Sequence, residues 1–396
     1  MAVATALDRP PPAAATAPTR RDAIAALGVG LNSLLIAGLL APLLGALADE
    51  HRLSASQIGL TASAELLSMA LASGLAGLAL APRRLKVLGV AASLGLAGCD
   101  LATTVASGWQ ATAVRACAGA AEGVLLWIAI GMIARMATPE RWAGAFFTAQ
   151  TVVQLVLALA YATFVIPIFG ANGGYVCLAI CALIGLAPAL AGPSRYPPLP
   201  AGQASAGPPP LRGWIALAAT LVFFSANGAV AVYLQRYALQ AGLAPSVART
   251  AVWVALAAQV AGSAAATALA GRVRWFPVFV AATGAWLIAW TCFALRVPAP
   301  LFVAANGLSG LVALFVGPFY VPLAIDADPS RRAAMQTGAA QLLGGAAGPL
   351  MAFGLVTSRD AHGVLILGAG LLLAGLAIMA WLRATTPSEG ARRSSR

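Results

Sequence analysis

Long apolar stretches recur along the chain, and short polar segments separate them. Twelve stretches reach roughly 20 residues or more, the length that an α-helix needs to cross the hydrocarbon core of a bilayer. They are residues 23–47, 58–81, 86–107, 111–137, 142–168, 173–193, 213–239, 246–271, 274–296, 299–325, 333–357 and 363–383. The pattern predicts an all-α integral membrane protein with 12 transmembrane helices.

The segment between the sixth and seventh stretches, PSRYPPLPAGQASAGPPPLR, is rich in Pro, Gly and Ser and is typical of a flexible linker. A shift of 191 residues places Arg115–Gly119 on Asn306–Gly310 and Gln150 on Gln341, as an internal repeat would. We therefore expect two pseudo-symmetric six-helix bundles. The expected parts are a disordered cytoplasmic tail (1–22), an N-terminal bundle (23–193), a cytoplasmic linker (194–212), a C-terminal bundle (213–383) and a basic cytoplasmic tail (384–396).

Composition supports a lipid environment, because only 9% of the residues are charged, against roughly 25% in soluble proteins. The net charge of +12 lies mostly in loops and tails, so we expect no nucleic-acid partner. The even-numbered connections and the tails hold 18 basic residues and the odd-numbered connections 5, which puts both termini in the cytoplasm. The preference for Arg, Ala and Gly is typical of a GC-rich bacterial genome, so we expect a bacterial inner membrane.

The sequence favours neither an enzyme nor a metalloprotein. Its five cysteines lie in apolar stretches without zinc spacing, and both histidines lie in loops. It contains no nucleotide-binding loop, and we expect no cofactor and no metal. A membrane enzyme or sensor would need a catalytic cluster or a soluble domain, and we find neither pattern.

The segment RACAGAAEG, residues 115–123, places charges inside an apolar stretch. Arg115 and Glu122 are seven residues apart and so share one helix face. An ionised side chain at the bilayer centre costs about 3 kcal/mol on insertion scales, so these residues need partners, water or a function. Two other acids, Glu65 and Asp100, also lie within predicted spans of the N-terminal half. The repeat puts Asn306 and Ala313 where Arg115 and Glu122 stand.

Helical rise predicts similar depths for Glu65, Asp100 and Arg115, with Glu122 closer to the midplane. We expect Arg115 to pair with Asp100 or Glu65, and Glu122 to face a central cavity. Burial disfavours charged carboxylates, so at least one acid is expected to hold a proton. Glu122 or Glu65 is then the group that we expect to take up and release a proton. The alternative is a static ion-pair lattice between three helices, and for Asp100 alone we favour that structural role.

Neutral polar residues inside the spans are candidates for contact with a substrate, or for bonds between helices. They are Asn32, Gln150, Gln154, Asn227, Gln259, Asn306, Gln336 and Gln341. The sequence Gly344-x-x-x-Gly348-Pro349 allows close helix packing and a bend, so it is either a packing site or a hinge for gating.

Two of these segments resemble motifs of the major facilitator superfamily (MFS) of secondary transporters, and the resemblance extends over residues 23–383. RACAGAAEG resembles the fourth-helix signature, which places Arg115 and Gly119 at a proton-relay position. GLALAPRRLK, residues 77–86, resembles the motif between helices 2 and 3, with Arg83, Arg84 and Lys86 as its basic part. That similarity implies a gating role for Arg83 and Arg84.

This sequence departs from the family pattern at two points. Ala81 stands where the loop motif has Asp, and G-x-x-x-G-P lies in the eleventh helix rather than the fifth. By analogy with the family, helices 1, 4, 7 and 10 line the cavity, which favours Asn32, Glu122, Asn227 and Asn306 as contacts.

Together these observations predict a secondary transporter that works by alternating access, with proton-coupled efflux of an amphipathic or aromatic small molecule. The expected partners are this substrate, protons and the lipid bilayer, and we expect a monomer. Two alternatives stay open: proton-coupled uptake of a small organic acid, and an uncoupled facilitator or lipid-moving protein. An uncoupled protein would not need Glu65 or Glu122.

Overall fold

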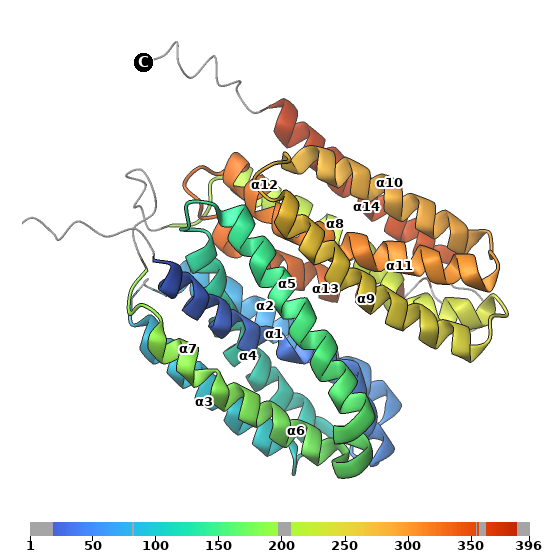
Figure 1. Ribbon diagram of the computed structural model, residues 1–396, viewed down its shortest axis with the longest axis horizontal. Helices are drawn as coiled ribbons and strands as arrows, with labels where there is room; N and C mark the ends of the chain where they lie inside the picture. The colour runs from blue at the N-terminus through green and yellow to red at the C-terminus, as the bar shows by residue number, and fades with distance from the viewer. Residues whose placement is uncertain (1–18, 81–82, 197–206, 354, 356–361, 386–396) are drawn as a thin grey trace, which may run out of the picture.

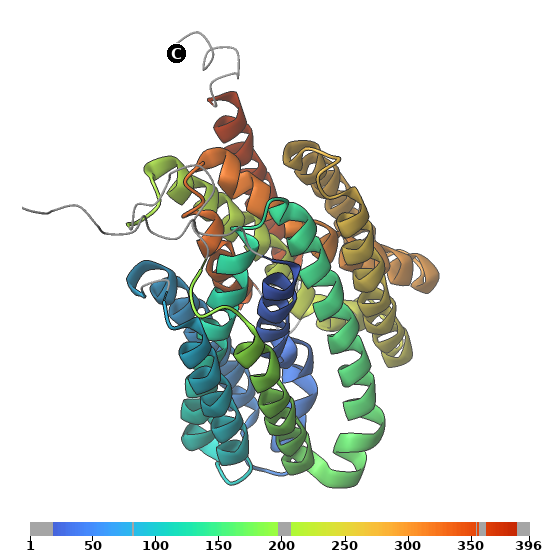
Figure 2. The same cartoon turned by 60° about the vertical axis from the view of Figure 1, so that its left-hand side comes forward.

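The computed structural model describes residues 19–80, 83–196, 207–353, 355 and 362–385, and these residues are almost entirely helical. The helices fall into two groups, which lie side by side in Figures 1 and 2. The first group contains α1 (Arg20–Asp49), α2 (Ala55–Ala79), α3 (Leu85–Thr103), α4 (Gly108–Ile133), α5 (Pro139–Ala160), the π-helical turn η1 (Tyr161–Val165), α6 (Ile166–Ile184) and α7 (Leu186–Ala191).

The second group follows the linker. It contains α8 (Leu211–Gln240), α9 (Pro245–Leu269), α10 (Trp275–Ala294), α11 (Ala299–Phe315), η2 (Gly317–Phe319), α12 (Tyr320–Ala327), η3 (Ala334–Gln336), α13 (Thr337–Phe353) and α14 (His362–Ala384). The short elements η2 and η3 are 3₁₀ turns.

Each of the twelve predicted spans coincides with one helix or with consecutive helical segments, so the predicted fold is confirmed. Ten helical stretches among the described residues are long and apolar enough to cross a membrane. One of them, Pro139–Ala191, holds two predicted spans, because helical structure continues from α5 through η1 to α7. The eleventh predicted span contains α13, which is only 17 residues long.

The helix boundaries differ from the predicted ones where local polar groups act. α1 begins at Arg20, so the predicted tail of residues 1–22 is too long by three residues. The cause is a capping box: the Asp22 amide donates to Thr19 Oγ1 at 3.2 Å, and the Thr19 amide donates to Asp22 Oδ2 at 3.0 Å. Most of both tails and the middle of the linker, at 197–206, lie outside the described residues.

A glycine and a proline interrupt regular α-helix at two places. Gly170 has φ of +65°, a conformation that suits glycine, and it makes a kink inside α6. Here the Ala171 amide donates to Glu50 Oε1 at 2.7 Å. The predicted span 299–325 is broken at η2, because Pro318 supplies no amide hydrogen for a continuous α-helix.

The hydrophobic core is divided in the same way as the helices. One cluster of buried side chains, which includes Phe223, Phe279 and Trp286, is drawn entirely from residues 216–382. A second cluster lies entirely within residues 26–196, and a third joins the first group of helices to a few residues of α8, α12, η3 and α13. Each half therefore has its own packed interior.

The internal repeat is visible in the packing of equivalent helix pairs. Gly119 of α4 lies against the main-chain oxygen of Glu65 in α2, and a Cβ atom at this position would collide with that oxygen. Gly310 of α11 lies in the same way against the main-chain oxygen of Ala255 in α9. Gly119 and Gly310 are 191 residues apart, and Glu65 and Ala255 are 190 residues apart, so the repeat relates two helix pairs that pack through equivalent glycines.

The two halves meet at the end of the bundle where α1 begins and α14 ends. The Arg331 guanidinium donates to the main-chain oxygens of Ala134 and Met136 at 2.8 and 3.1 Å. The hydroxyl oxygens of Thr148 in α5 and Thr267 in α9 are 2.9 Å apart. We call this end, which is defined by these contacts between the halves, the termini-side closure.

Candidate functional site

A buried cluster of ionisable side chains lies within the N-terminal half. Arg115 of α4 reaches Glu65 of α2 with two groups: Nε donates to Oε2 at 3.1 Å, and Nη2 pairs with Oε1. Its Nη1 donates to Asp100 Oδ1 of α3 at 2.6 Å. All three side chains are almost fully buried. Fork-like pairing of a guanidinium with carboxylates is the geometry that arginine favours.

The close approach of α2 and α4 makes this pairing possible. Gly119 and Gly123 present no side chain to α2 and lie against the main-chain oxygens of Glu65 and Met69. Arg115 leaves α4 one turn before Gly119, on the same helix face. Small residues on the shared face therefore bring the guanidinium within reach of the Glu65 carboxylate.

Glu122 completes the cluster but makes a weaker contact. Its Oε1 is 4.0 Å from Arg115 Nη2, and its Oε2 has no hydrogen-bond partner among the described residues, although the residue is only 2% exposed. The ring of Tyr175 from α6 lies 5.3 Å from the Arg115 guanidinium carbon, in cation–π geometry. Three carboxyl groups thus share one guanidinium.

The structure pairs Arg115 with both Glu65 and Asp100, where the sequence analysis offered either one. The expectation that Glu122 faces a central cavity is not met in this structure, because Glu122 is enclosed by the N-terminal half and does not line the cavity described below. Its part in proton coupling stays a prediction.

The polar candidates of the N-terminal half mainly join neighbouring helices. Asn32 Nδ2 donates to Ser93 Oγ at 3.3 Å and to the main-chain oxygen of Ala182 at 3.5 Å, while its Oδ1 has no partner among the described residues. Gln154 donates to the main-chain oxygen of Leu34, and the Oε1 of Gln150 lacks a partner in the same sense. Neither Asn32 nor Gln154 lines the cavity of the other half, so for these two the interhelical alternative is the one observed.

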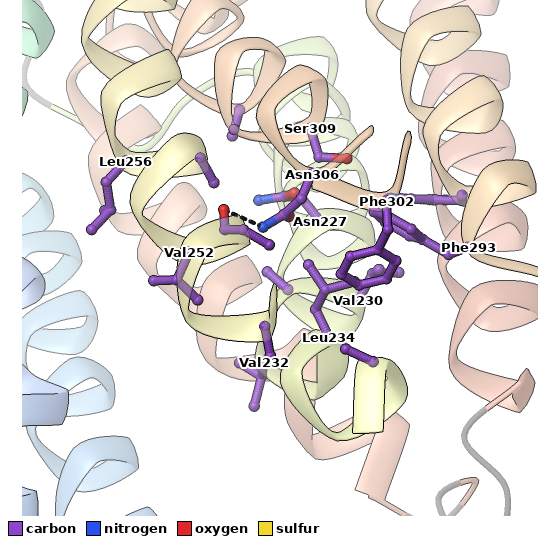
Figure 3. Close-up of a pocket in the computed structure, with 18 of the residues that line it drawn as sticks. Asn227, Val230, Val232, Leu234, Val252, Leu256, Phe293, Phe302, Asn306 and Ser309 are labelled. Atoms are coloured by element: carbon purple, nitrogen blue, oxygen red, sulfur yellow. Dashed lines mark hydrogen bonds between the residues drawn. The ribbon is translucent and has the colours of Figure 1, made fainter. Parts of the chain in front are cut away.

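A cavity of about 230 Å³ lies within the C-terminal half, between α8, α9, α10 and α11 (Figure 3). Its polar lining residues are Asn227, Gln259, Asn306 and Ser309, and its aromatic ones are Trp290, Phe293 and Phe302. Asn306 Nδ2 donates to the main-chain oxygen of Ala251 at 2.7 Å. Two lining residues, Val232 of α8 and Val252 of α9, are 61% and 45% exposed, which puts the mouth of the cavity between these helices.

The structure brings together Asn227 and Asn306, two of the predicted substrate contacts, on the wall of this cavity. Gln341 of α13 is buried and is not part of the lining. Sequence reasoning missed Ser309 and the aromatic wall, because serine and aromatic residues are common in the packed interiors of membrane helices and carry no distinguishing pattern.

The predicted gating residues Arg83 and Arg84 are exposed, and the first described linker residues lie beside them. Arg83 forms an isolated β-bridge with Arg195, and Arg84 precedes α3 with φ of +59°. Ala81, which stands at the Asp position of the loop motif, lies outside the described residues. Among the residues that the structure describes, these two arginines form no hydrogen bond or ion pair with the C-terminal half.

Other arginines make the contacts at the termini-side closure. Beside Arg331, Arg135 at the end of α4 donates to the main-chain oxygen of Gly131 at 2.7 Å and reaches Met335 Sδ of the other half at 3.1 Å. Its guanidinium lies 4.2 Å from the centre of the Tyr196 ring. From the sequence, Arg135 and Arg331 are predicted only as loop charges.

The glycines of α13 pack closely against α8. A Cβ atom at Gly344 or Gly348 would meet the main-chain oxygen of Leu221 or Ser225. The main-chain oxygen of Pro349 accepts a hydrogen bond from the Tyr233 hydroxyl at 3.3 Å. The structure therefore displays the packing alternative for this motif, and the hinge stays a prediction.

Solved structures of transporters share this fold. The crystal structure of the human organic anion transporter MFSD10 (TETRAN) matches with 16% identity and a TM-score of 0.71, covering 92% of this chain and 100% of that chain. FucP, an MFS transporter in the outward conformation, matches with 13% identity and a TM-score of 0.71, over 90% and 98% of the two chains. XylE, a proton:xylose symporter bound to 6-bromo-6-deoxy-D-glucose, matches with 13% identity and a TM-score of 0.69, over 93% and 94%.

At these identities the structural matches show the fold alone. A search among curated proteins finds no match to this chain. The sequence profile described as the Major Facilitator Superfamily matches residues 25–352, which is most of the chain and includes both the ion cluster and the cavity. The chain therefore belongs to the Major Facilitator Superfamily and is a multi-pass membrane transporter.

Proposed function

We propose that this protein is a secondary transporter that couples the efflux of an amphipathic or aromatic small molecule to protons. The observation that carries the proposal is the cluster in which Glu65, Asp100 and Glu122 surround Arg115, the one guanidinium in contact with them among the described residues. Such a cluster can change its charge by taking up or releasing a proton.

The charge balance favours Glu122 over Glu65 as the proton-carrying group. If all three carboxyl groups were ionised, the cluster would carry two uncompensated negative charges in a site shielded from water. Burying an unpaired charge is strongly unfavourable, so at least one carboxyl holds a proton. Glu65 and Asp100 make the close contacts with Arg115, whereas Glu122 stands 4.0 Å away with one free oxygen. Glu122 therefore loses least by being protonated.

The cavity of the C-terminal half supports an amphipathic or aromatic substrate. Its walls combine aromatic rings with the amides of Asn227 and Asn306, a mixture that suits a molecule with an apolar body and a few polar groups. Efflux is the direction of transport that we propose for such a molecule.

Alternating access requires that the halves separate at one end while they close at the other. We propose that both termini are cytoplasmic, so that the termini-side closure is the inner gate and the structure is outward-facing. Opening this gate breaks the contacts of Arg331 and Arg135 with the opposite half. Arg83 and Arg84 then take part in gating at their position beside the linker. Gly344, Gly348 and Pro349 let α13 bend during this motion.

Uptake into proteoliposomes with an imposed pH gradient, measured for a panel of labelled compounds, tests this function. Proton-coupled export is an exchange, so a gradient that is acid inside drives accumulation of the substrate. Accumulation under an acid-outside gradient would instead identify a symporter, as expected for uptake of an organic acid. Equal equilibration under both gradients would identify an uncoupled facilitator and contradict the proposal.

A further inference from the structure

The cavity of the C-terminal half occupies the place that the ion cluster occupies in the N-terminal half. The shift of 191 residues relates Arg115 to Asn306 and Glu122 to Ala313. Because Gly119 lies on the main-chain oxygen of Glu65 and Gly310 on that of Ala255, Ala255 is the counterpart of Glu65. Asn306, Ala313 and Ala255 all line the cavity.

Loss of side-chain volume at these positions explains why a cavity is present here. Two glutamates of the N-terminal half are replaced by the methyl groups of Ala255 and Ala313. Asn306 is shorter than Arg115. Its amide donates to the main-chain oxygen of Ala251, whereas Arg115 pairs with carboxylates on two neighbouring helices. Protein interiors leave few voids larger than one water molecule, so about 230 Å³ in this position is a built cavity and not a packing defect.

One polar group in the cavity wall has no partner within the protein. The Oγ of Ser309 makes no hydrogen bond among the described residues, although this residue is only 8% exposed. A buried hydroxyl without a partner is unfavourable, and a bound molecule that supplies the partner would remove this penalty. The nearby rings of Phe293 and Phe302 offer an apolar wall.

We propose that this cavity binds an uncharged molecule with an aromatic body and a hydrogen-bonding group that contacts Ser309. The inference rests on the proposed function, namely that the chain carries a small molecule, and it names the class of that molecule. No described lining residue carries a charge, so an ion bound here would lose its hydration without compensation. A cavity of about 150 Å³ accommodates benzene, so this one fits a substituted ring or a fused two-ring system.

Three naphthalene derivatives of similar shape test the proposal: 2-naphthamide, 2-naphthoate and 2-naphthylmethylammonium. Their binding to the purified full-length protein is measured by isothermal titration calorimetry at neutral pH. We expect the uncharged amide to bind at least about tenfold more tightly than either ion, because only the ions lose uncompensated hydration. Equal or tighter binding of the carboxylate would overturn the uncharged class.

Variants that fill the cavity place the ligand. Ala255→Leu and Ala313→Leu add bulk to the lining, and we expect each to weaken amide binding about tenfold or more. Ala257→Leu, on the exposed face of the same helix α9, is the matched control and is expected to bind as the unchanged protein does. Two leucine variants are used so that a folding failure of one leaves the other informative, and unchanged binding in a folded variant would overturn the site.

Ser309→Ala separates a ligand contact from a structural role. Because this hydroxyl has no partner among the described residues, its removal is expected to leave the thermal unfolding midpoint unchanged or higher while it weakens amide binding severalfold. A lower midpoint with unchanged binding would contradict the assignment. Equilibrium binding needs neither a gradient nor a transport cycle, so failure of proton coupling would not affect this result.

Discussion

The Arg331 guanidinium lies across the boundary between the halves and donates to the main-chain oxygen of Ala134 at 2.8 Å. Ala134 directly follows α4, where unpaired carbonyl groups give a helix end its partial negative charge. The positive charge of Arg331 therefore hydrogen-bonds to a helix terminus, and the Glu140 carboxylate adds an electrostatic attraction. This contact links the C-terminal half to the helix that carries Arg115 and Glu122.

Replacing Arg331 by alanine should open the termini-side closure. Loss of a charged hydrogen bond at a partly exposed site is worth about 1 kcal/mol, which shifts the conformational equilibrium roughly fivefold. The measurement is the rate of disulfide formation between Thr148→Cys and Thr267→Cys in a background without native cysteines, because these hydroxyls are 2.9 Å apart across the closure. We expect slower cross-linking in the Arg331→Ala variant.

The neighbouring Arg332 provides the control for this experiment. Its guanidinium donates to the main-chain oxygen of Pro208 at 3.1 Å, within the C-terminal half and the end of the linker. Arg332→Ala removes the same charge from the same loop and should leave the cross-linking rate close to that of the parent protein. Equal effects of both variants would mean that loop charge, and not the contact with α4, controls the closure.

Gly119→Ala should destabilise the packing of α2 against α4. The added methyl group would collide with the main-chain oxygen of Glu65, and overpacking of this kind typically costs about 1–3 kcal/mol. Thermal unfolding of the detergent-solubilised protein measures the effect. Gly98→Ala in α3 meets no atom within 4 Å and should be neutral or slightly stabilising, since alanine favours a helix over glycine. A similar loss in both variants would argue against the close approach.

Arg115→Gln should destabilise the protein far more than removal of a surface charge does. The substitution leaves Glu65 and Asp100 buried without a positive partner, a change that costs about 3–5 kcal/mol in buried ion pairs. The yield of folded protein and its unfolding midpoint report the loss. The triple variant Glu65→Gln, Asp100→Asn, Arg115→Gln replaces the ions by amides of similar shape and should recover most of the stability. No difference between single and triple variants would contradict charge compensation.

The sequence predicts the membrane spans and the pairing of Arg115 because both follow from the cost of placing polar groups in lipid. In the bilayer, an apolar stretch of spanning length satisfies its backbone hydrogen bonds by forming an α-helix. A buried guanidinium needs an acid at the same depth. Glu65 and Asp100 are two of only three acids at such positions, so few alternatives existed.

Other features depend on contacts that leave no mark in the sequence. Arg331 binds main-chain oxygens, and every helix end offers such groups, so the partner could not be deduced from residue types. The cavity arises from small residues such as Ala255 and Ala313, which are indistinguishable from ordinary alanines in an alanine-rich chain. The enclosure of Glu122 depends on how tightly the N-terminal half packs, which helix spacing alone does not determine.

The most direct test of the central claim compares gradient-driven transport with substrate exchange in proteoliposomes that contain Glu122→Gln. Glutamine preserves the shape of the side chain but cannot release a proton, so the account predicts that pH-driven accumulation is lost while exchange of labelled for unlabelled substrate continues. A variant of the cavity wall such as Asn227→Asp cannot replace this comparison, because it adds a charge to the cavity and leaves the buried cluster unchanged. Driven accumulation that persists in both Glu122→Gln and Glu65→Gln would contradict the assignment of proton coupling to the buried cluster.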